Sequence, residues 1–218
     1  MNAPHAHDKH PRLVVIGNGM AGMRTVEELL KLAPGMYRIT VFGAEPHGNY
    51  NRILLSPVLA GEKTVDDIML NTREWYDANG VTLHAGDPVV RIDRKKRVVY
   101  AASGLAVPYD RLLIATGSKP FIVPVPGHQL PGVIGFRDLS DVDTMLSAAR
   151  AGGKAVVIGG GLLGLEAANG LLRQGMEVAV VHVTGSLMNQ QLDPPAAELL
   201  RASLELRGLR ILLNRQTV

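Results

Sequence analysis

The sequence predicts an α/β protein made of two Rossmann-like dinucleotide-binding units with parallel sheets, the second of them incomplete. Two glycine-rich turns of the form G-x-G-x-x-G carry this prediction, one beginning at Gly17 and the other at Gly159. Each follows an apolar run directly and opens a helical pattern, which makes the pair far more specific than a single copy. The composition, 46% hydrophobic with 24 glycines, is that of a globular α/β chain.

The first half of the chain begins with a strand–helix–strand unit. An apolar run predicts a strand at about 12–16. Apolar residues at helical spacing predict a helix over about 20–33, which Pro34-Gly35 ends. A second strand is expected at 38–42, which completes the βαβ entry of the first unit.

Short helices and a meander are expected next. Residues 52–60 and 72–79 have helical patterns, with Thr72 as a cap and Gly80 as the stop. Short alternating runs then predict a small antiparallel meander, at 81–83, 89–92, 97–100 and 105–107. The basic cluster Arg94–Arg97 lies between two of these runs and reads as a solvated hairpin tip. A strand at 111–115 returns to the parallel sheet.

The second half repeats the βαβ pattern after a proline- and glycine-rich connection at 119–135. Ser140 and Asp143 resemble a capping box, which predicts a helix to about Ala151. Strands are then expected at 154–158, 178–183 and 209–213. Helices are expected at 162–174 and from Pro194 to Gly208. A doubly wound sheet needs more strands than these, so the second unit is expected to be incomplete. The expected division is a disordered tail at 1–11, a first domain at 12–136 and a second domain at 137–218.

Composition excludes several classes of function. The net charge of +3 is too small, and the basic residues too scattered, for a nucleic-acid partner. There is no cysteine, so no disulfide, thiolate metal site or cysteine-held iron–sulfur cluster forms within these residues, and electron chemistry needs an organic cofactor. No apolar run approaches the roughly 18 residues of a membrane span, which makes a cytoplasmic protein without a membrane partner the expectation. His5, His7 and His10 lie in a polar start that reads as a flexible tail, with metal binding as the open alternative.

The residue order of each glycine turn is suited to a pyrophosphate. The first glycine permits a tight turn, the second lets the backbone approach the phosphates, and the third lets helix pack on strand. The helix that follows presents unpaired N–H groups and a partial positive charge to the anion. Two such turns predict two dinucleotides, as in a flavoprotein that is reduced by a nicotinamide cofactor.

Three segments resemble a known family. They are Tyr50–Gly61, which contains the run Asn51-Arg52-Ile53-Leu54-Leu55-Ser56, together with Asp66–Asn71 and Phe136–Asp143. They are similar to segments of the large subunit of NAD(P)H-dependent nitrite reductases, within the pyridine nucleotide–disulfide oxidoreductase superfamily. The resemblance covers nearly everything from Arg12 onward, although the dithiol of the superfamily's disulfide branch is absent.

The resemblance implies an FAD site in the first domain and a nicotinamide dinucleotide site in the second. The implied FAD-binding residues are Gly17, Gly19, Met20, Ala21, Gly22, Glu45, Asn51, Arg52, Val89, Ala115, Thr116 and Gly117. The implied residues of the second site are Gly159, Gly161, Leu162, Leu163, Gly164, Glu166 and His182.

Individual roles also follow from the resemblance. Arg52 would face the flavin or its phosphates, Val89 would pack against adenine, and Ala115-Thr116-Gly117 would close over the cofactor. Glu166 would lie near the contact between flavin and nicotinamide, so Arg52 and Glu166 are the expected catalytic residues. A surface position for Arg52, an ordinary strand exit at 115–117, and a purely structural role for Glu166 in the first helical turn stay open.

Two positions depart from the expected pattern. A ribose-binding acid should end the second strand of each unit. In the first unit Glu45 comes one position late, and in the second His182 takes the place of the acid. A neutral histidine neither binds a ribose strongly nor repels the 2′-phosphate of NADPH, and a protonated one would attract it. The resemblance favours NADH, and His182 leaves NADPH open.

The expected function is the electron-input module of an assimilatory nitrite reductase, an FAD-dependent NAD(P)H oxidoreductase in which NADH delivers a hydride to FAD. Its electrons would pass to iron–sulfur and sirohaem domains or a subunit outside these residues, and a homodimer stays open. A ferredoxin or rubredoxin reductase module is the first alternative, although Pro57 stands where such reductases carry a lysine that would pair with Glu166. A non-catalytic dinucleotide-binding fragment is the second.

Overall fold

The computed structural model describes residues 10–218, which form two compact units. His5, His7 and most of the expected tail lie outside the described residues. Of the described residues, unit 1 contains those up to Asn51 together with Met69–Ser118, and unit 2 contains Arg52–Ile68 together with Lys119–Val218. This division by contacts is not the expected single boundary at 136/137, because the segment Arg52–Ile68 groups with the second half of the chain.

Unit 1 is built on a four-stranded parallel sheet in the order β5-β2-β1-β9. Its strands are β1 (Arg12–Ile16), β2 (Arg38–Gly43), β5 (Val81–Ala85) and β9 (Arg111–Ile114). The strands expected at 12–16, 38–42 and 111–115 are therefore confirmed. The run at 81–83 was wrongly assigned to the meander, since it pairs in parallel with β2. A short isolated apolar run has the same local pattern in both kinds of sheet, and only its partner distinguishes them.

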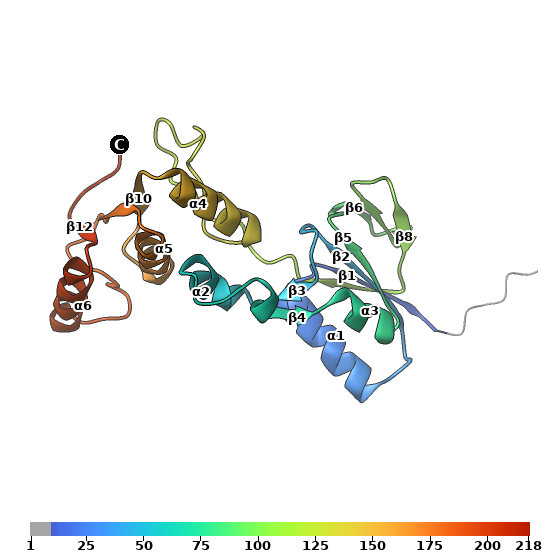
Figure 1. The fold of residues 1–218 in the computed structure, drawn as a ribbon. Coiled ribbons are helices and arrows are strands. Elements are labelled where there is room, and N and C mark those ends of the chain that lie inside the picture. The colour runs from blue at the N-terminus through green and yellow to red at the C-terminus, as the bar shows by residue number, and fades with distance from the viewer. Residues whose placement is uncertain (1–9) are drawn as a thin grey trace, which may run out of the picture. The chain divides into compact units, whose positions relative to one another are not determined.

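Each face of this sheet has its own core, as the alternation of side chains along a strand requires. Leu13 and Val15 of β1 pack with Met23 and Val26 of α1 (Met20–Leu32). Tyr76 of α3 (Arg73–Ala78) belongs to the same cluster. Figure 1 shows α1 and α3 on this side of the sheet, and strands β6 and β8 on the other side.

The other face of the sheet is covered by the antiparallel meander. It consists of β6 (Val89–Asp93), β7 (Val98–Ala101) and β8 (Ala106–Pro108). Val14 and Ile16 of β1 pack against buried residues of the meander, Val99 among them. The basic cluster forms the exposed β6–β7 turn, where the backbone N–H groups of Lys95 and Lys96 donate to Asp93 Oδ1.

A small two-stranded ribbon that the sequence pattern did not indicate completes unit 1. It pairs β3 (Asn49–Tyr50) with β4 (Met69–Asn71) in antiparallel register. Both strands are too short for a period-2 signal, and their pairing joins chain positions about 20 residues apart. Thr72 stands at the N-cap position of α3, as expected, although its side chain makes no capping hydrogen bond.

An ion pair joins the starts of the two neighbouring strands β1 and β9. The Asp110 carboxylate accepts from the Arg12 backbone N–H at 2.8 Å, from Nε at 3.0 Å and from a second guanidinium nitrogen at 3.2 Å. The hydrogen bonds from the Arg12 side chain, and then from its backbone, lower the pKa of Asp110 from 3.8 to about 2. A bidentate pair of this kind favours the ionised carboxylate in the folded state.

We therefore expect Asp110→Asn to weaken the acid sensitivity of the fold. Because the pKa of Asp110 is depressed by folding, its contribution is fully present above about pH 4 and is lost as the pH falls toward about 2. Urea unfolding at pH 5 and pH 3 should give a smaller loss of unfolding free energy in the variant than in the wild type. Equal losses in both proteins would contradict this account of the pair.

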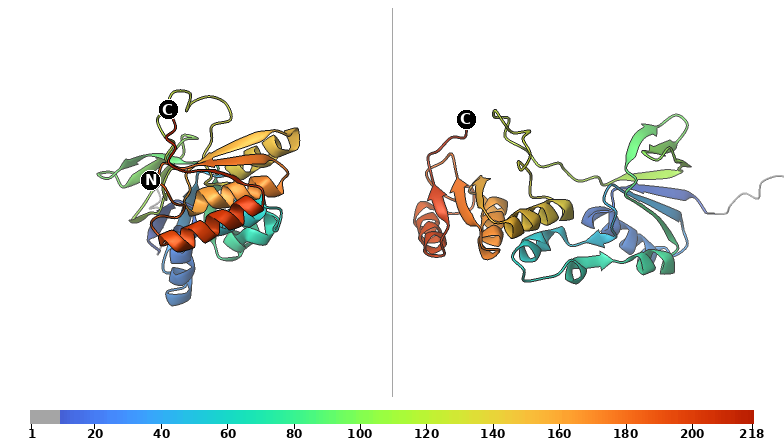
Figure 2. Two further views of the ribbon diagram at one scale, coloured as in Figure 1. Left: turned by 90° about the vertical axis from the view of Figure 1, so that its left-hand side faces the viewer. Right: turned by 45° about the horizontal axis from the view of Figure 1, so that its top comes forward.

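Unit 2 contains a three-stranded parallel sheet in the order β10-β11-β12. The strands are β10 (Lys154–Ile158), β11 (Glu177–Val181) and β12 (Arg210–Leu212), joined through α5 (Leu162–Arg173) and α6 (Pro194–Leu206). Both helices lie on the same side of the three strands (Figure 2), as consecutive right-handed crossovers require. All five elements agree in type and place with those expected.

A helical segment from the first half of the chain packs in unit 2. It consists of a 3₁₀ turn at Arg52–Leu54, α2 (Leu55–Leu59) and a second 3₁₀ turn at Asp66–Ile68. Gly170 of α5 permits this packing, because a β-carbon there would lie 2.7 Å from Leu59 Cγ. The Gln174 side chain adds a hydrogen bond to the Leu59 carbonyl at 2.8 Å. The expected helix at 52–60 exists, but its neighbour is α5.

The helix α4 (Leu139–Ala151) begins two residues earlier than expected. Its N-cap is Asp138, whose side chain accepts from the Asp141 N–H at 3.0 Å, and Asp141 Oδ2 accepts from the Asp138 N–H at 3.2 Å. The capping box is therefore Asp138 with Asp141, and the expected pair of Ser140 and Asp143 was wrong. Two overlapping pairs have the same spacing here, and the extended backbone of Asp138 selects the first.

Candidate dinucleotide sites

The three glycines of the first turn differ in what surrounds them. Gly17 has φ +114°, and a β-carbon there would lie 2.1 Å from the Ala115 carbonyl oxygen. A β-carbon on Gly22 would lie 2.5 Å from the Gly17 carbonyl oxygen. Gly19 is the N-cap of α1 and has no heavy atom within 4 Å of the β-carbon position. Gly17 and Gly22 are thus required by packing, whereas Gly19 faces open space.

The second glycine turn is similar, except that a β-carbon on Gly159 would meet no neighbour within 4 Å, so only its backbone conformation requires a glycine. Gly159 has φ +122°, and a β-carbon on Gly164 would lie 2.1 Å from the Gly159 carbonyl oxygen. Gly161 is the N-cap of α5 and, like Gly19, has nothing within 4 Å of its β-carbon position. The N–H of each first glycine donates to a carbonyl near the end of the neighbouring strand, from Gly17 to Phe42 and from Gly159 to Val181.

Both helix starts suit an anion. Neither α1 nor α5 has an acidic residue in its first turn, so the expected place of Glu166 in the first turn of its helix was wrong. Leu162 and Leu163 are more than half exposed, Met20 is half-buried and Ala21 is exposed, so the backbone around both turns can be approached. The unpaired N–H groups of a helix start, together with the open space above the second glycine, fit a pyrophosphate. The residues present therefore fit two dinucleotides.

The end of β9 lies directly against the first turn. The Ala115 N–H donates to the Ile16 carbonyl at 2.8 Å, and the Thr116 nitrogen would be 3.0 Å from a β-carbon on Gly17. Thr116 and Gly117 are exposed, and Gly117 has φ +72°. The structure thus brings the expected triplet 115–117 together with the glycine turn in unit 1.

The residues expected to contact the ribose and the adenine also lie in unit 1. Glu45 is half-buried and its carboxylate accepts from the Tyr50 hydroxyl at 2.6 Å. Gly43, the last residue of β2, must stay small, since a β-carbon there would lie 2.9 Å from Asn18 Cβ. Val89 is half-buried and packs against the meander core, and Asn51 is the last residue of the segment that belongs to unit 1.

The two expected catalytic residues belong to unit 2. One guanidinium nitrogen of Arg52 donates to the Arg137 carbonyl at 2.8 Å. Glu166, in α5, accepts from the Ser56 hydroxyl at 2.6 Å. The residue before Pro57 thus supplies Glu166 with a hydrogen bond, where a lysine at position 57 would supply an ion pair.

His182 follows β11 and lies beside the second glycine turn. Its Nδ1 accepts from the Gly160 N–H at 3.1 Å, and its Nε2 lies 2.8 Å from Thr184 Oγ1. The histidine therefore contacts the glycine turn itself.

Three polar residues near these turns escaped the sequence reasoning: Asn18, Tyr76 and Ser56. Asn18, the middle residue of the first turn, donates to the His47 carbonyl at 3.1 Å and accepts from the Tyr76 hydroxyl at 2.6 Å. An asparagine between two glycines gives a usable signal, because its side chain can hold a turn. Tyr76 and Ser56 give no such local signal.

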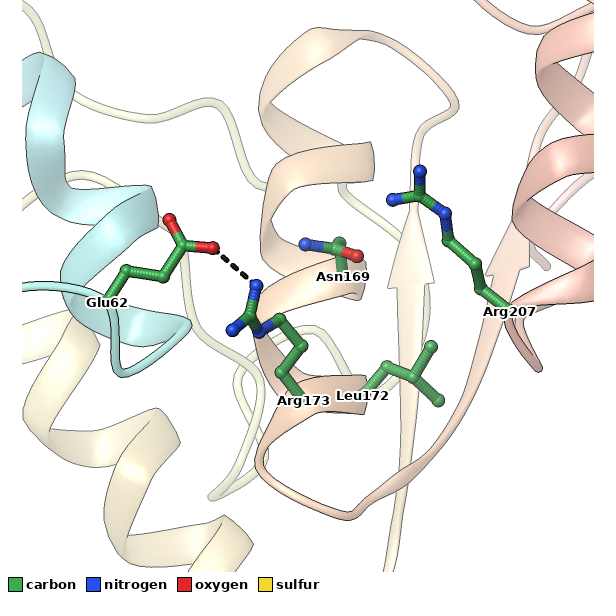
Figure 3. A pocket seen from close by; sticks show the side chains of 5 residues that line it. All are labelled: Glu62, Asn169, Leu172, Arg173 and Arg207. Atoms are coloured by element: carbon green, nitrogen blue, oxygen red, sulfur yellow. Dashed lines mark hydrogen bonds and ion pairs between the residues drawn. The ribbon is translucent and has the colours of Figure 1, made fainter.

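A pocket of about 470 Å³ lies at the other end of α5 (Figure 3). Asn169, Leu172 and Arg173 line it from α5, facing Glu62 and Arg207, and Arg173 forms an ion pair with Glu62. Because the glycine turn opens the opposite end of the helix, this pocket is separate from the candidate site.

Among residues 10–218 no three histidine, cysteine or acidic side chains lie close enough together to hold a metal ion. Within the same range no helix is both long and apolar enough to cross a membrane.

Parallel βαβ units whose glycine turns open helices define the class of dinucleotide-binding α/β proteins. Within that class, the chain belongs to the pyridine nucleotide-disulphide oxidoreductase family, whose model matches residues 11–218. The predicted fold class and the oxidoreductase character of the chain are thereby confirmed.

Similar proteins include relatives in nitrogen metabolism. The chain is 51% identical over 206 residues to the NAD(P)H nitrite reductase of Bacillus subtilis, covering 94% of this chain and 26% of that protein. It is 50% identical over 210 residues to the assimilatory nitrate reductase electron transfer subunit of the same organism, covering 96% and 27%. These matches confirm the resemblance found from the sequence. The chain spans about a quarter of the length of these relatives.

Solved structures agree in fold. The NADH:rubredoxin oxidoreductase from Clostridium acetobutylicum superposes with a TM-score of 0.84 at 26% identity, covering 95% of this chain and 54% of that chain. The ferredoxin reductase for the CYP199A2 system from Rhodopseudomonas palustris gives 0.86 at 26% identity, covering 96% and 52%.

Proposed function

We propose that this chain is the electron-input module of an assimilatory nitrite reductase, in which NADH reduces a bound FAD. The observation that carries the proposal is the matched geometry of the two glycine turns. In both, the first glycine has a positive φ, +114° at Gly17 and +122° at Gly159, and the third is required by packing, whereas the second opens a helix and faces empty space. A second glycine that packing does not need is explained by close approach of a phosphate.

The assignment of the two cofactors follows the surroundings of each turn. In unit 1 the turn has Ala115-Thr116-Gly117 beside it, and Val89 of the meander packs against the core that the meander shares with β1, which suits the larger FAD. Unit 2 would take the nicotinamide dinucleotide at Gly159–Gly164. When bound, the flavin would supply the redox chemistry, because it can take up two electrons together and release them one at a time.

The residues of the chain bind and orient. The backbone N–H groups at the starts of α1 and α5 would hold the two pyrophosphates. Glu166 is the fifth residue of α5, and the hydrogen bond from Ser56 fixes one oxygen of its carboxylate. We assign Glu166 the role of orienting the nicotinamide end of the cofactor, with Ser56 as its support, and we retain Arg52 as a residue that meets the flavin.

The electron acceptor lies outside these 218 residues in this proposal. The chain has no cysteine to hold an iron–sulfur cluster. The names of the two Bacillus subtilis relatives, a nitrite reductase and an electron transfer subunit, support a separate electron acceptor. We propose iron–sulfur or sirohaem domains in that place. A cytoplasmic location and a homodimer complete the proposal.

A pair of matched variants tests it. Gly19→Ala and Gly161→Ala each add one methyl group where the structure has open space and φ near −90°, so both proteins should fold like the wild type. In the protein at its full natural length, Gly19→Ala should weaken FAD binding at least about tenfold and leave NADH binding within about threefold. Gly161→Ala should do the reverse. Flavin fluorescence and calorimetric titration with NADH measure the two constants.

Several outcomes would contradict the proposal. Wild-type FAD affinity in Gly19→Ala would mean that no phosphate approaches this turn. Loss of FAD in Gly161→Ala, with NADH retained, would exchange the two assignments. A wild-type protein whose bound flavin is not bleached by NADH under anaerobic conditions would instead be a dinucleotide-binding fragment without catalytic activity.

A reductase for a small iron–sulfur carrier is a second candidate, favoured by the two solved structures above. Their 26% identity is about half of that to the Bacillus subtilis relatives, which supports the first candidate. Reduction of a ferredoxin or a rubredoxin by NADH, at rates above those with nitrite reductase acceptor domains, would favour the second.

A further inference from the structure

The imidazole of His182 uses both of its ring nitrogens within the protein. Gly160, the middle residue of the second glycine turn, donates its N–H to Nδ1 at 3.1 Å. On the other side of the ring, Nε2 lies 2.8 Å from the Thr184 hydroxyl oxygen. His182 stands where an acid would contact the ribose of the dinucleotide, yet its polar atoms point at the turn and at its own loop.

The hydrogen bonds assign the protonation of the ring. The Thr184 hydroxyl donates its single proton to the Ser186 carbonyl, at 3.0 Å, so it must accept from Nε2–H. Nδ1 then carries no proton, as it must to accept from Gly160. This assignment rests on the network of partners, and it leaves the neutral ring with no donor for a ligand.

The loop that follows β11 holds Gly160 from its other side as well. The Met188 N–H donates to the Gly160 carbonyl at 2.9 Å. A β-carbon on Gly160 would lie 2.6 Å from the fully buried Leu187 side chain and 2.9 Å from the imidazole. Met188 has φ +51°, a left-handed conformation that a non-glycine residue keeps only where its surroundings hold it.

We propose that His182 is a positioning residue for the nicotinamide dinucleotide turn and does not read the 2′ position of the adenosine ribose. The inference rests on the proposed function of unit 2. A neutral imidazole with both nitrogens engaged offers neither a hydrogen bond to a 2′-hydroxyl nor a charge to a 2′-phosphate. NADH and NADPH should therefore both bind, and a substitution of His182 should change the affinities for both by the same factor.

Three variants of the protein at full natural length test the inference. His182→Leu keeps the volume but leaves the Gly160 N–H without its acceptor, and should weaken NADH and NADPH binding alike, by about tenfold. His182→Asn offers an amide oxygen near the position of Nδ1 and should restore both affinities to within about threefold of the wild type. Thr184→Val removes the acceptor of Nε2–H and should weaken both to a smaller, equal extent.

The decisive readout is the ratio of the two dissociation constants, measured by calorimetry on proteins whose circular dichroism matches the wild type. A ratio that stays within about threefold in all folded variants supports the inference that His182 does not read the 2′ position. Recovery of both affinities in His182→Asn supports the role of Nδ1, because asparagine would not rescue a loss of fold. A tenfold change of the ratio in any variant would mean that His182 reads the 2′ position. Asparagine as damaging as leucine would overturn the role of Nδ1.

The result also separates this inference from the proposed function. Wild-type protein that binds neither NADH nor NADPH would overturn the proposed function of unit 2. Wild-type binding combined with an altered ratio in the variants would overturn only the role of His182. If His182→Leu does not fold, Thr184→Val and His182→Asn still give the ratio.

Discussion

Replacing Gly17 with alanine is expected to destabilise unit 1 by about 3–5 kcal/mol. The backbone of Gly17 has φ +114°, which strains any residue with a β-carbon. The added methyl group would also lie 2.1 Å from the Ala115 carbonyl oxygen and 2.5 Å from its carbon. Both are backbone atoms, held in the sheet by the hydrogen bond from Ala115 to Ile16, so neither can move aside cheaply.

Two other glycines provide matched controls for Gly17→Ala. Gly35 has φ +73° but open space around its β-carbon position, so Gly35→Ala should cost only the backbone strain of about 1–2 kcal/mol. Gly19 has neither strain nor a close neighbour, so Gly19→Ala should unfold like the wild type. Urea unfolding followed by circular dichroism gives the three values. Equal losses in Gly17→Ala and Gly35→Ala would show that the clash with Ala115 is relieved by movement.

Replacing Tyr76 with alanine is expected to have an effect of similar size, about 3–5 kcal/mol. Tyr76 is 1% exposed and packs in the core between α1, α3 and the sheet. Its hydroxyl donates to Asn18 Oδ1 at 2.6 Å and accepts from the Asn49 N–H at 3.2 Å. The truncation therefore leaves a cavity and removes the support of the first glycine turn.

Tyr76→Phe separates the hydroxyl from the ring. It should cost about 1–3 kcal/mol, since it leaves polar groups of Asn18 and Asn49 without this partner. Because Asn18 is the middle residue of the glycine turn, FAD affinity should fall as well, whereas NADH affinity should not. Urea unfolding and flavin titration measure the two effects, and wild-type values of both in Tyr76→Phe would contradict them.

The same variant should change the alkaline limit of stability. Burial raises the pKa of Tyr76 from 10.0 to about 12, so the folded state keeps its proton where the unfolded chain has lost it. The contribution of this group is present below about pH 10 and is lost as the pH rises toward about 12. Tyr76→Phe should therefore lose less stability than the wild type between these pH values.

Much of the fold could be predicted because its signals are local. The apolar run of β1, the helical spacing of α1 and the Pro34-Gly35 stop act within a few residues of one another. The errors arose where the outcome depended on a distant partner. The run beginning at Val81 reads the same in a meander and in a parallel sheet, and its pairing with β2 decides.

The candidate sites divide in the same way. The glycine turns could be found from sequence, because their tasks depend on the backbone conformation of the glycines themselves. The support of Glu166 could not, because Ser56 lies 110 residues away in the chain. The partner of His182 could not be found either, because a ring at the end of a strand can point at a ligand or at its own turn, and only packing selects between them.

The amino-acid sequence by itself determined that this chain forms two βαβ units with a glycine-rich turn at the start of a helix in each. Periodicity, glycine and proline act on the nearby backbone, and these features need nothing else. Only the tertiary structure decided that Arg52–Ile68 packs with α5, that Ser56 holds Glu166 and that His182 holds Gly160. Such contacts join residues whose separation in the chain leaves no local pattern, so they exist only once the chain is folded.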